Sequence, residues 1–220
     1  MYVKDIMIDS IIPEILLVSA SFLILILYHI FLLFQIRRSP QATSFGLTRK
    51  LRHSWVQMIM QEKRDILAVQ TLRNWIMSAS FFASTSILIS LGTLNVLLGG
   101  EHVPQLLHAL NLFGSRNETL WLIKVIVLII DFFVAFFNFA LTIRYYNHVN
   151  FMINVSPDKE KSISVDSVSN ALDMGTMHYT LGMRSYYFAV PFTLWLFGPM
   201  LMLAGTVTMT IVLYTLDRTA

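Results

Sequence analysis

The chain has 220 residues, of which 55% are hydrophobic and 13% are charged, and its formal net charge is +3. Soluble domains usually carry about 25% charged residues. This composition, together with a mean hydropathy of +0.63, therefore indicates an integral membrane protein. The sequence contains no cysteine, which excludes disulfides, thiolate metal sites and a cysteine nucleophile. It also contains no phosphate-binding glycine loop and no nucleophile elbow.

Four long apolar runs occupy most of the chain, at residues 11–36, 75–98, 119–143 and 186–214. Each is longer than the ~20 residues that a helix needs to cross a hydrocarbon layer of about 30 Å. We therefore predict an all-α fold, a four-span transmembrane helical bundle that forms a single integral membrane domain over residues 1–220.

The basic residues are concentrated in two connections, the one after the first run and the one after the third. On this side, with its flanks, lie Arg37, Arg38, Arg49, Lys50, Arg52, Lys63, Arg64, Arg73, Arg144, Lys159, Lys161 and Arg184. The opposite side has Lys4, Arg116 and Arg218. Because basic loops stay in the cytoplasm, we predict a multi-pass protein of the plasma (inner) membrane with both termini outside the cytoplasm. The positive charge then reflects orientation, and we predict no nucleic-acid partner.

Before the second run, residues 48–74 contain no glycine or proline and have the pattern of an amphipathic helix. The apolar residues, at a spacing close to 3.6, are Leu51, Trp55, Met58, Ile59, Ile66, Val69 and Leu72. We predict a cytoplasmic amphipathic helix that runs into the second span. It could lie flat on anionic lipid, or it could extend the second span as a cytoplasmic stalk packed on a partner. We favour the stalk, because the pattern leads without a break into the second run. The residues expected at the cytoplasmic interface are Trp55, Arg49, Lys50, Arg52, Arg144, Asn147 and Arg184.

The second run concentrates small residues at helical spacing. Pairs four residues apart are Ala79 with Ala83, Ser80 with Ser84, and Ser86 with Ser90. Small residues allow helix backbones to approach closely in lipid, so we predict that this helix is central to the bundle and packs through these residues. Its hydroxyl groups can bond to carbonyls of their own helix and therefore do not require a pore.

The third run carries a polar stripe, Lys124, Asp131 and Asn138, at intervals of seven residues. The three side chains project from nearly one helix face, but the rise of about 10 Å between neighbours prevents direct bonds between them. A carboxylate near the middle of a span costs about 2.5–3.5 kcal/mol, so Asp131 needs a partner on another helix, a water or its own proton. We expect hydroxyl groups of the second span as donors. The stripe is either interhelical glue or a contact to another subunit, which we favour, or a proton or ion path.

The connection to the last run reads as a surface loop with a short helix around residues 165–172, capped by Ser162 or Ser164. Helix-disturbing residues in the last run are Pro191, Gly198, Pro199 and Gly205. They predict a kinked helix. None of the six histidines has a second ligand three or four residues away, so we predict no metal site.

Three segments, in this order, carry a resemblance to a known family. They are RHSWVQMIMQEKRDILAVQTLRNWIMSASFFASTSIL (Arg52–Leu88), AFFNFALTIRYYNH (Ala135–His148) and GMRSYYFAVPFTLWLFGPMLM (Gly182–Met202). Through them, the chain resembles, over nearly its whole length, the uncharacterised membrane family catalogued as domain of unknown function 599. The resemblance implies a four-span membrane fold and no established activity.

We therefore expect a non-catalytic integral membrane protein, most simply an accessory or structural subunit of a larger membrane complex. Its partners are then the lipid bilayer and other membrane subunits or further copies of itself. The alternative is a small oligomeric ion or proton transporter or channel that uses Lys124, Asp131 and Asn138. An enzyme ranks third, because the ionisable residues form no recognisable set of nucleophile, base and oxyanion stabiliser. We predict no cofactor.

Overall fold

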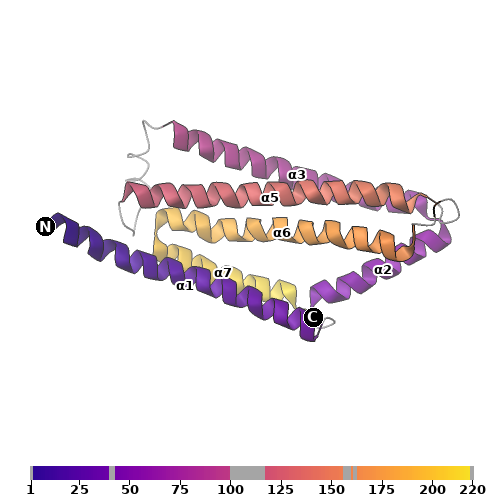
Figure 1. Ribbon diagram of the computed structural model, residues 1–220, viewed down its shortest axis with the longest axis horizontal. Helices are drawn as coiled ribbons and strands as arrows, with labels where there is room; N and C mark the ends of the chain where they lie inside the picture. The colour runs from indigo at the N-terminus through magenta and orange to yellow at the C-terminus, as the bar shows by residue number, and fades with distance from the viewer. Residues whose placement is uncertain (1, 40–42, 100–116, 156–159, 161–162, 219–220) are drawn as a thin grey trace.

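The computed structural model describes residues 2–39, 43–99, 117–155, 160 and 163–218. The helices in these residues (Figure 1) are α1 Tyr2–Arg38, α2 Ser44–Glu62, α3 Asp65–Leu98, α5 Glu118–Ile153, α6 Val165–Phe197 and α7 Pro199–Asp217. Four helices are long and apolar enough to cross a membrane: α1 from Ile12 onward, α3, α5 and α7. The prediction of an all-α fold with four such helices is confirmed.

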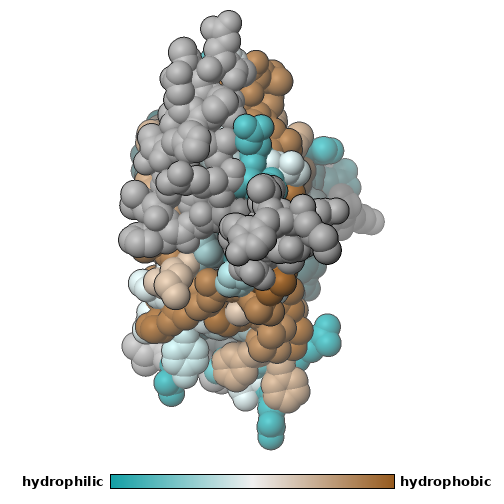
Figure 2. All heavy atoms as spheres, turned by 90° about the vertical axis from the view of Figure 1, so that its left-hand side faces the viewer, coloured by the Kyte–Doolittle hydropathy of each residue, from teal (hydrophilic) through white to brown (hydrophobic). Residues whose placement is uncertain are grey.

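The long helices pack in a row, α3 on α5, α5 on α6, α6 on α7, and α7 on α1. The first four alternate in direction, whereas α1 runs parallel to α7, and α2 extends beyond the end of α1 to pack mainly on α6 (Figure 1). Large apolar side chains remain exposed on every helix of the row. Seen from the end where α6 meets α7, the described surface is largely hydrophobic (Figure 2). The helix predicted to be central, α3, lies at one end of the row.

Two glycines of α6 let this helix approach α5 closely. A Cβ atom at Gly175 would lie 2.5 Å from the ring of Tyr146, and one at Gly182 would lie 2.8 Å from the ring of Phe139. The ring of Phe139 also packs with small residues of α3 in a buried cluster. The aromatic side chains of α5 thus occupy the space that the glycines leave, and α5 becomes the helix that joins α3 to α6.

The predicted continuous helix over residues 48–74 consists of two helices. After α2 ends, Lys63 adopts a left-handed backbone with a φ of 52°, and α3 then runs without a break through the second predicted span. α2 folds back so that Val56 and Ile59 join a buried cluster with residues of α3, α5 and α6. Ile66 was predicted on the same apolar face, but it is 77% exposed. It lies in α3, after the reversal, so the spacing that places residues on one face of α2 no longer applies to it. α2 therefore packs on helices of its own chain and does not extend α3 as a continuous stalk.

The fourth predicted span, 186–214, is divided between two antiparallel helices rather than kinked (Figure 1). α6 begins after Ser164, whose side chain caps it as predicted, and continues past the expected short helix to Phe197. Gly198 then has a φ of 157°, which glycine adopts without strain. Pro199 starts α7, at a position where its missing N–H costs nothing. A chain reversal thus replaces the predicted kink.

This reversal brings the end of the described chain to the far end of α1. Arg218 forms an isolated antiparallel bridge with Thr43, and the Ser44 hydroxyl donates to the carbonyl oxygen of Leu216 at 3.0 Å. Tyr2 and Arg218 therefore lie at opposite ends of α1 (Figure 1). The side of a membrane on which each terminus lies, outside the cytoplasm for both as predicted, stays a prediction.

Candidate functional site

The first residue of the polar stripe on α5 is neutralised by a residue of α1. Lys124 Nζ lies 2.6 Å from Glu14 Oε1, and both side chains are 2% exposed. Nζ also lies 5.7 Å from the ring centroid of Trp195 in α6. A buried ammonium group is tolerated when it is paired. Glu14 was not among the predicted site residues, although it is a single carboxylate inside the first apolar run.

The second residue of the stripe, Asp131, is buried opposite Ser185 of α6, whose side chain interacts with its carboxylate. Its other oxygen, Oδ2, is buried without a hydrogen-bond partner among the described residues. Asp131 lines a cavity of about 470 Å³ between α1, α5 and α6, together with His29, Asn138 and Arg184. A buried carboxylate oxygen without a donor, beside a cavity, is a feature that a proton or a small ligand could use.

The third residue of the stripe, Asn138, ties α5 to α6. Its Oδ1 lies 3.0 Å from His178 Nδ1, and its Nδ2 donates to the carbonyl oxygen of Val134 at 2.8 Å. The His178 ring stacks on Tyr145 of α5 with an interplanar angle of 11°. The stripe therefore contacts α1 through Lys124 and contacts α6 through all three of its residues.

A second polar cluster joins α1, α6 and α7. Arg184 Nη2 donates to both carboxylate oxygens of Asp217, at 2.8 and 2.7 Å. The Tyr28 hydroxyl donates to Asp217 Oδ2 at 2.5 Å, and His29 Nε2 lies 3.4 Å from Arg184 Nη1. The sequence analysis expected only Arg184 here. The adjacent tyrosine and histidine in an apolar run were the signal for the rest of the cluster.

The small residues of α3 divide between an inward and an outward face. The buried ones are Ala79, Ala83, Ser86 and Ser90. Ser90 donates to the carbonyl oxygen of Ile129 in α5 at 3.1 Å, and Ser86 donates to the Tyr186 hydroxyl of α6 at 3.1 Å. We expected hydroxyl groups of α3 to bind Asp131, whereas the carboxylate interacts with Ser185 of α6. Ser80 is half-buried and Ser84 is exposed. The predicted pair Ser80 with Ser84 therefore does not form part of the buried face.

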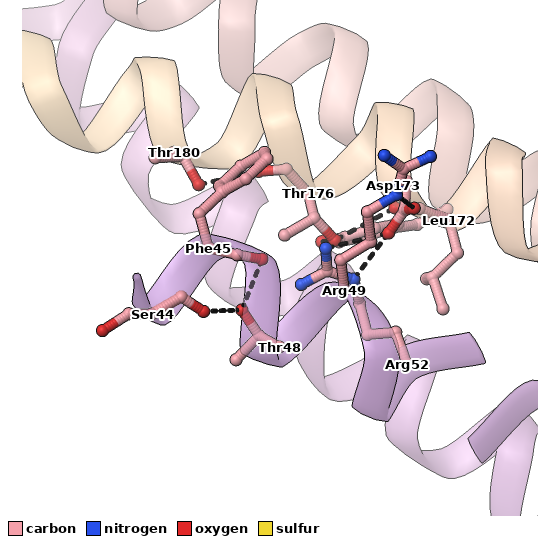
Figure 3. Close-up of polar contacts among 10 residues, drawn as sticks. Ser44, Phe45, Thr48, Arg49, Arg52, Leu172, Asp173, Thr176 and Thr180 are labelled. Atoms are coloured by element: carbon pink, nitrogen blue, oxygen red, sulfur yellow. Dashed lines mark hydrogen bonds and ion pairs between the residues drawn. The ribbon is translucent and has the colours of Figure 1, made fainter. Parts of the chain in front are cut away.

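Two of the predicted interface residues of α2, Arg49 and Arg52, bind Asp173 of α6 (Figure 3). We call these three residues the clamp. Each arginine donates from Nε to one oxygen of the carboxylate, Arg49 at 2.9 Å and Arg52 at 2.8 Å. The Arg52 side chain is 12% exposed, whereas that of Arg49 is 62% exposed. Trp55 is half-buried beside this clamp. The remaining predicted interface residues are exposed, namely Lys50, Arg144 and Asn147.

These clusters consist of paired or hydrogen-bonded groups that connect different helices. Within the part of the chain that the structure describes, no three histidine or carboxylate side chains gather in a group that could hold a metal ion. The described residues also line two cavities, one at Asp131 and one at Arg52.

The chain belongs to the family described as "Protein of unknown function, DUF599", whose model matches residues 16–220. This match confirms the resemblance found in the sequence. Comparison with curated proteins and with solved structures gave no match. The description of this family assigns no activity to its members.

Proposed function

We propose that this family member is a non-catalytic integral membrane protein that serves as an accessory or structural subunit and docks on another membrane protein through α3. The observation that carries the proposal is the outward row of small residues on this helix. Ser80, Ser84 and Gly92 lie on one row of four-residue steps, whose remaining position is Leu88, a large side chain that is 70% exposed. Ser84 is exposed, and open space surrounds the position of a Cβ at Gly92. The small residues on either side of Leu88 leave room for side chains of a second helix, and Leu88 forms the ridge between them.

The position of α3 supports the same role. In its most apolar stretch 17% of the residues are buried, against 39% for α5. α3 also lies at the end of the row of helices, so its outward side faces away from the rest of the chain (Figure 1). The polar stripe of α5, in contrast, contacts α1 and α6 of the same chain.

We place the protein in the plasma (inner) membrane with the basic end of the bundle, including α2, in the cytoplasm. The positive-inside rule favours this orientation, and Arg218 beside Thr43 adds to the basic side. Because α6 packs along α5 and α7 returns along α6, both helices also cross in this placement. The chain then crosses five times, with Tyr2 outside and Arg218 inside.

Cross-linking from single cysteines tests the docking role, because the sequence contains no cysteine of its own. A thiol-linked photoreactive group at Ser84→Cys should trap a partner protein, or a second copy, in native membranes. Leu16→Cys is the control, because Leu16 is 64% exposed on α1, outside the row of small residues. Mass spectrometry then identifies the trapped protein. If Ser84→Cys traps no more protein than Leu16→Cys, lipid covers this face and the proposal is wrong.

A second candidate function is proton or cation transport, favoured by the buried Asp131 Oδ2 that lacks a hydrogen bond beside a cavity. Protein reconstituted in liposomes should then carry a flux that Asp131→Asn abolishes. Asp173→Asn, which removes a carboxylate from the α2 clamp, should leave the flux intact. Absence of flux in the wild-type protein contradicts transport. A flux that survives Asp131→Asn while the purified assembly disperses assigns the carboxylate to helix association.

A further inference from the structure

A second cavity, of about 430 Å³, lies between α2, α3, α5 and α6, at the level where the second predicted span begins. Aromatic rings form much of its wall. The ring centroids of Trp55 and Trp75 are 6.3 Å apart, and those of Trp75 and Tyr146 are 5.5 Å apart. The Tyr146 hydroxyl is hydrogen-bonded to Thr176 at 3.2 Å, which holds the ring in place. The cavity is therefore a preformed apolar site with a few hydroxyl groups in its lining.

One wall of this cavity is cationic. Arg52 lines it, and Asp173 does not neutralise it fully, because Arg49 shares the same carboxylate (Figure 3). The clamp of two arginines and one aspartate keeps one net positive charge. Arg52 Nη2 forms an ion pair with Asp173 Oδ1 at 2.8 Å, which holds the guanidinium group at the wall of the cavity. The remaining positive charge of the clamp favours an anion in the cavity.

From this geometry we propose that the cavity binds an anionic amphiphile of the cytoplasmic leaflet, a lipid whose phosphate lies at Arg52 and whose apolar part lies between the aromatic rings. Tryptophan, tyrosine and arginine favour the headgroup level of a bilayer, which is where the proposed orientation puts these residues. A guanidinium group binds phosphate through paired hydrogen bonds, and it would repel a quaternary ammonium group. The inference uses the proposed placement in the membrane but not the docking role of α3.

Native mass spectrometry of delipidated protein in detergent tests this inference. Phosphatidylglycerol should show a saturable first binding event, and phosphatidylcholine with the same chains should bind about tenfold more weakly, which corresponds to about 1.4 kcal/mol. Inorganic phosphate should not compete at the same concentration, because it lacks the apolar part. Equal affinity for the two lipids overturns the assignment of an anionic ligand. Complete competition by inorganic phosphate overturns the assignment of a lipid.

Arg52→Gln and Arg49→Gln form a matched pair of variants. Each removes one guanidinium group and one partner of Asp173, but only Arg52 lines the cavity. Arg52→Gln should weaken binding of phosphatidylglycerol about tenfold. Arg49→Gln should weaken it by only about threefold, because it removes the net positive charge of the clamp but leaves the guanidinium group that lines the cavity. Equal weakening by both variants indicates attraction to surface charge in general and overturns the cavity site.

A third variant tests the apolar part of the site without a change of charge. Thr71 lines the cavity from α3, and Thr71→Leu adds volume there. It should weaken binding of phosphatidylglycerol while the protein keeps its thermal stability. This variant also keeps the inference testable if Arg52→Gln does not fold. Unchanged affinity in a folded Thr71→Leu protein overturns the placement of the lipid chain between the rings.

Discussion

The ion pair between Glu14 and Lys124 predicts an unusual pattern of stability effects. The variants are Glu14→Met, Lys124→Met and the double variant, in which both charges are replaced by unbranched apolar side chains of similar length. Each single change leaves one charge in a site where both side chains are 2% exposed, whereas the double change leaves none. The single variants should therefore be far less stable than the double variant.

The magnitude follows from the geometry. With 2.6 Å between Nζ and Oε1, an effective dielectric constant of about 20 gives an attraction of about 6 kcal/mol. Desolvation of the two ions opposes this attraction by several kcal/mol per ion. The intact pair thus contributes little to the free energy of unfolding. Removing one partner leaves an unpaired buried charge and should lower the free energy of unfolding by about 3–5 kcal/mol. The double variant should lie within about 1 kcal/mol of the wild type or above it.

The free energy of unfolding can be measured in detergent by SDS titration, with tryptophan fluorescence as the signal. Lys50→Met is the control, because Lys50 is exposed on α2 and its replacement should change stability by less than about 0.5 kcal/mol. The double-mutant cycle gives the coupling free energy of the pair directly. Losses below about 1 kcal/mol in both single variants, as found for exposed ion pairs, would refute the reasoning, and so would additive effects in the double variant.

Three further predictions concern helix packing and topology. Gly182→Ala should lower the free energy of unfolding by about 1–3 kcal/mol, because the new Cβ meets an aromatic ring of α5 at 2.8 Å; Gly92→Ala, at a position with open space, should not lower it, and equal losses would contradict this. Arg184→Gln removes the bidentate pair to α7 and should cost about 1.5–3 kcal/mol in the same assay; a loss below 0.5 kcal/mol, roughly the size of a neutral surface change, would contradict it. Cysteines at Arg38 and Arg218 should react with an impermeant maleimide from the same side of sealed vesicles; labelling from opposite sides would contradict the described topology.

The parts of the fold that could be predicted are those that depend on composition over a whole helix. Length and hydropathy suffice to find a helix that lipid can surround, and the runs 75–98 and 119–143 lie inside α3 and α5. The reversal at Lys63 could not be found in this way, because neither glycine nor proline marks it. It results from the burial of Val56 and Ile59 against helices that lie far away in the sequence.

The reversal at Gly198 could not be predicted from the local sequence for a different reason. The Gly-Pro pair predicts that the helix is disturbed, but the same pair is compatible with a kink and with a chain reversal. The outcome depends on whether the following segment can pack back on the preceding one. Here it can, because Gly205 of α7 leaves room for the Leu194 side chain of α6, which would lie 2.6 Å from a Cβ at that position. The number of crossings, and with it the side of the C-terminal end, therefore depends on a contact between two helices.

The partner of Lys124 was within reach of sequence reasoning, because polar residues in an apolar run mark the face that turns away from lipid. The buried polar residues of α1 are Glu14, Ser21 and Tyr28. Their spacing of seven residues is the same as in the stripe of α5, and the two helices run in the same direction (Figure 1). Because the two stripes have the same spacing and the helices are parallel, their residues can face each other in order. The first residue of the α1 stripe is then opposite the first residue of the α5 stripe. The carboxylate of Glu14 in α1 and the ammonium group of Lys124 in α5 attract each other, which favours this register. The structure contains this ion pair.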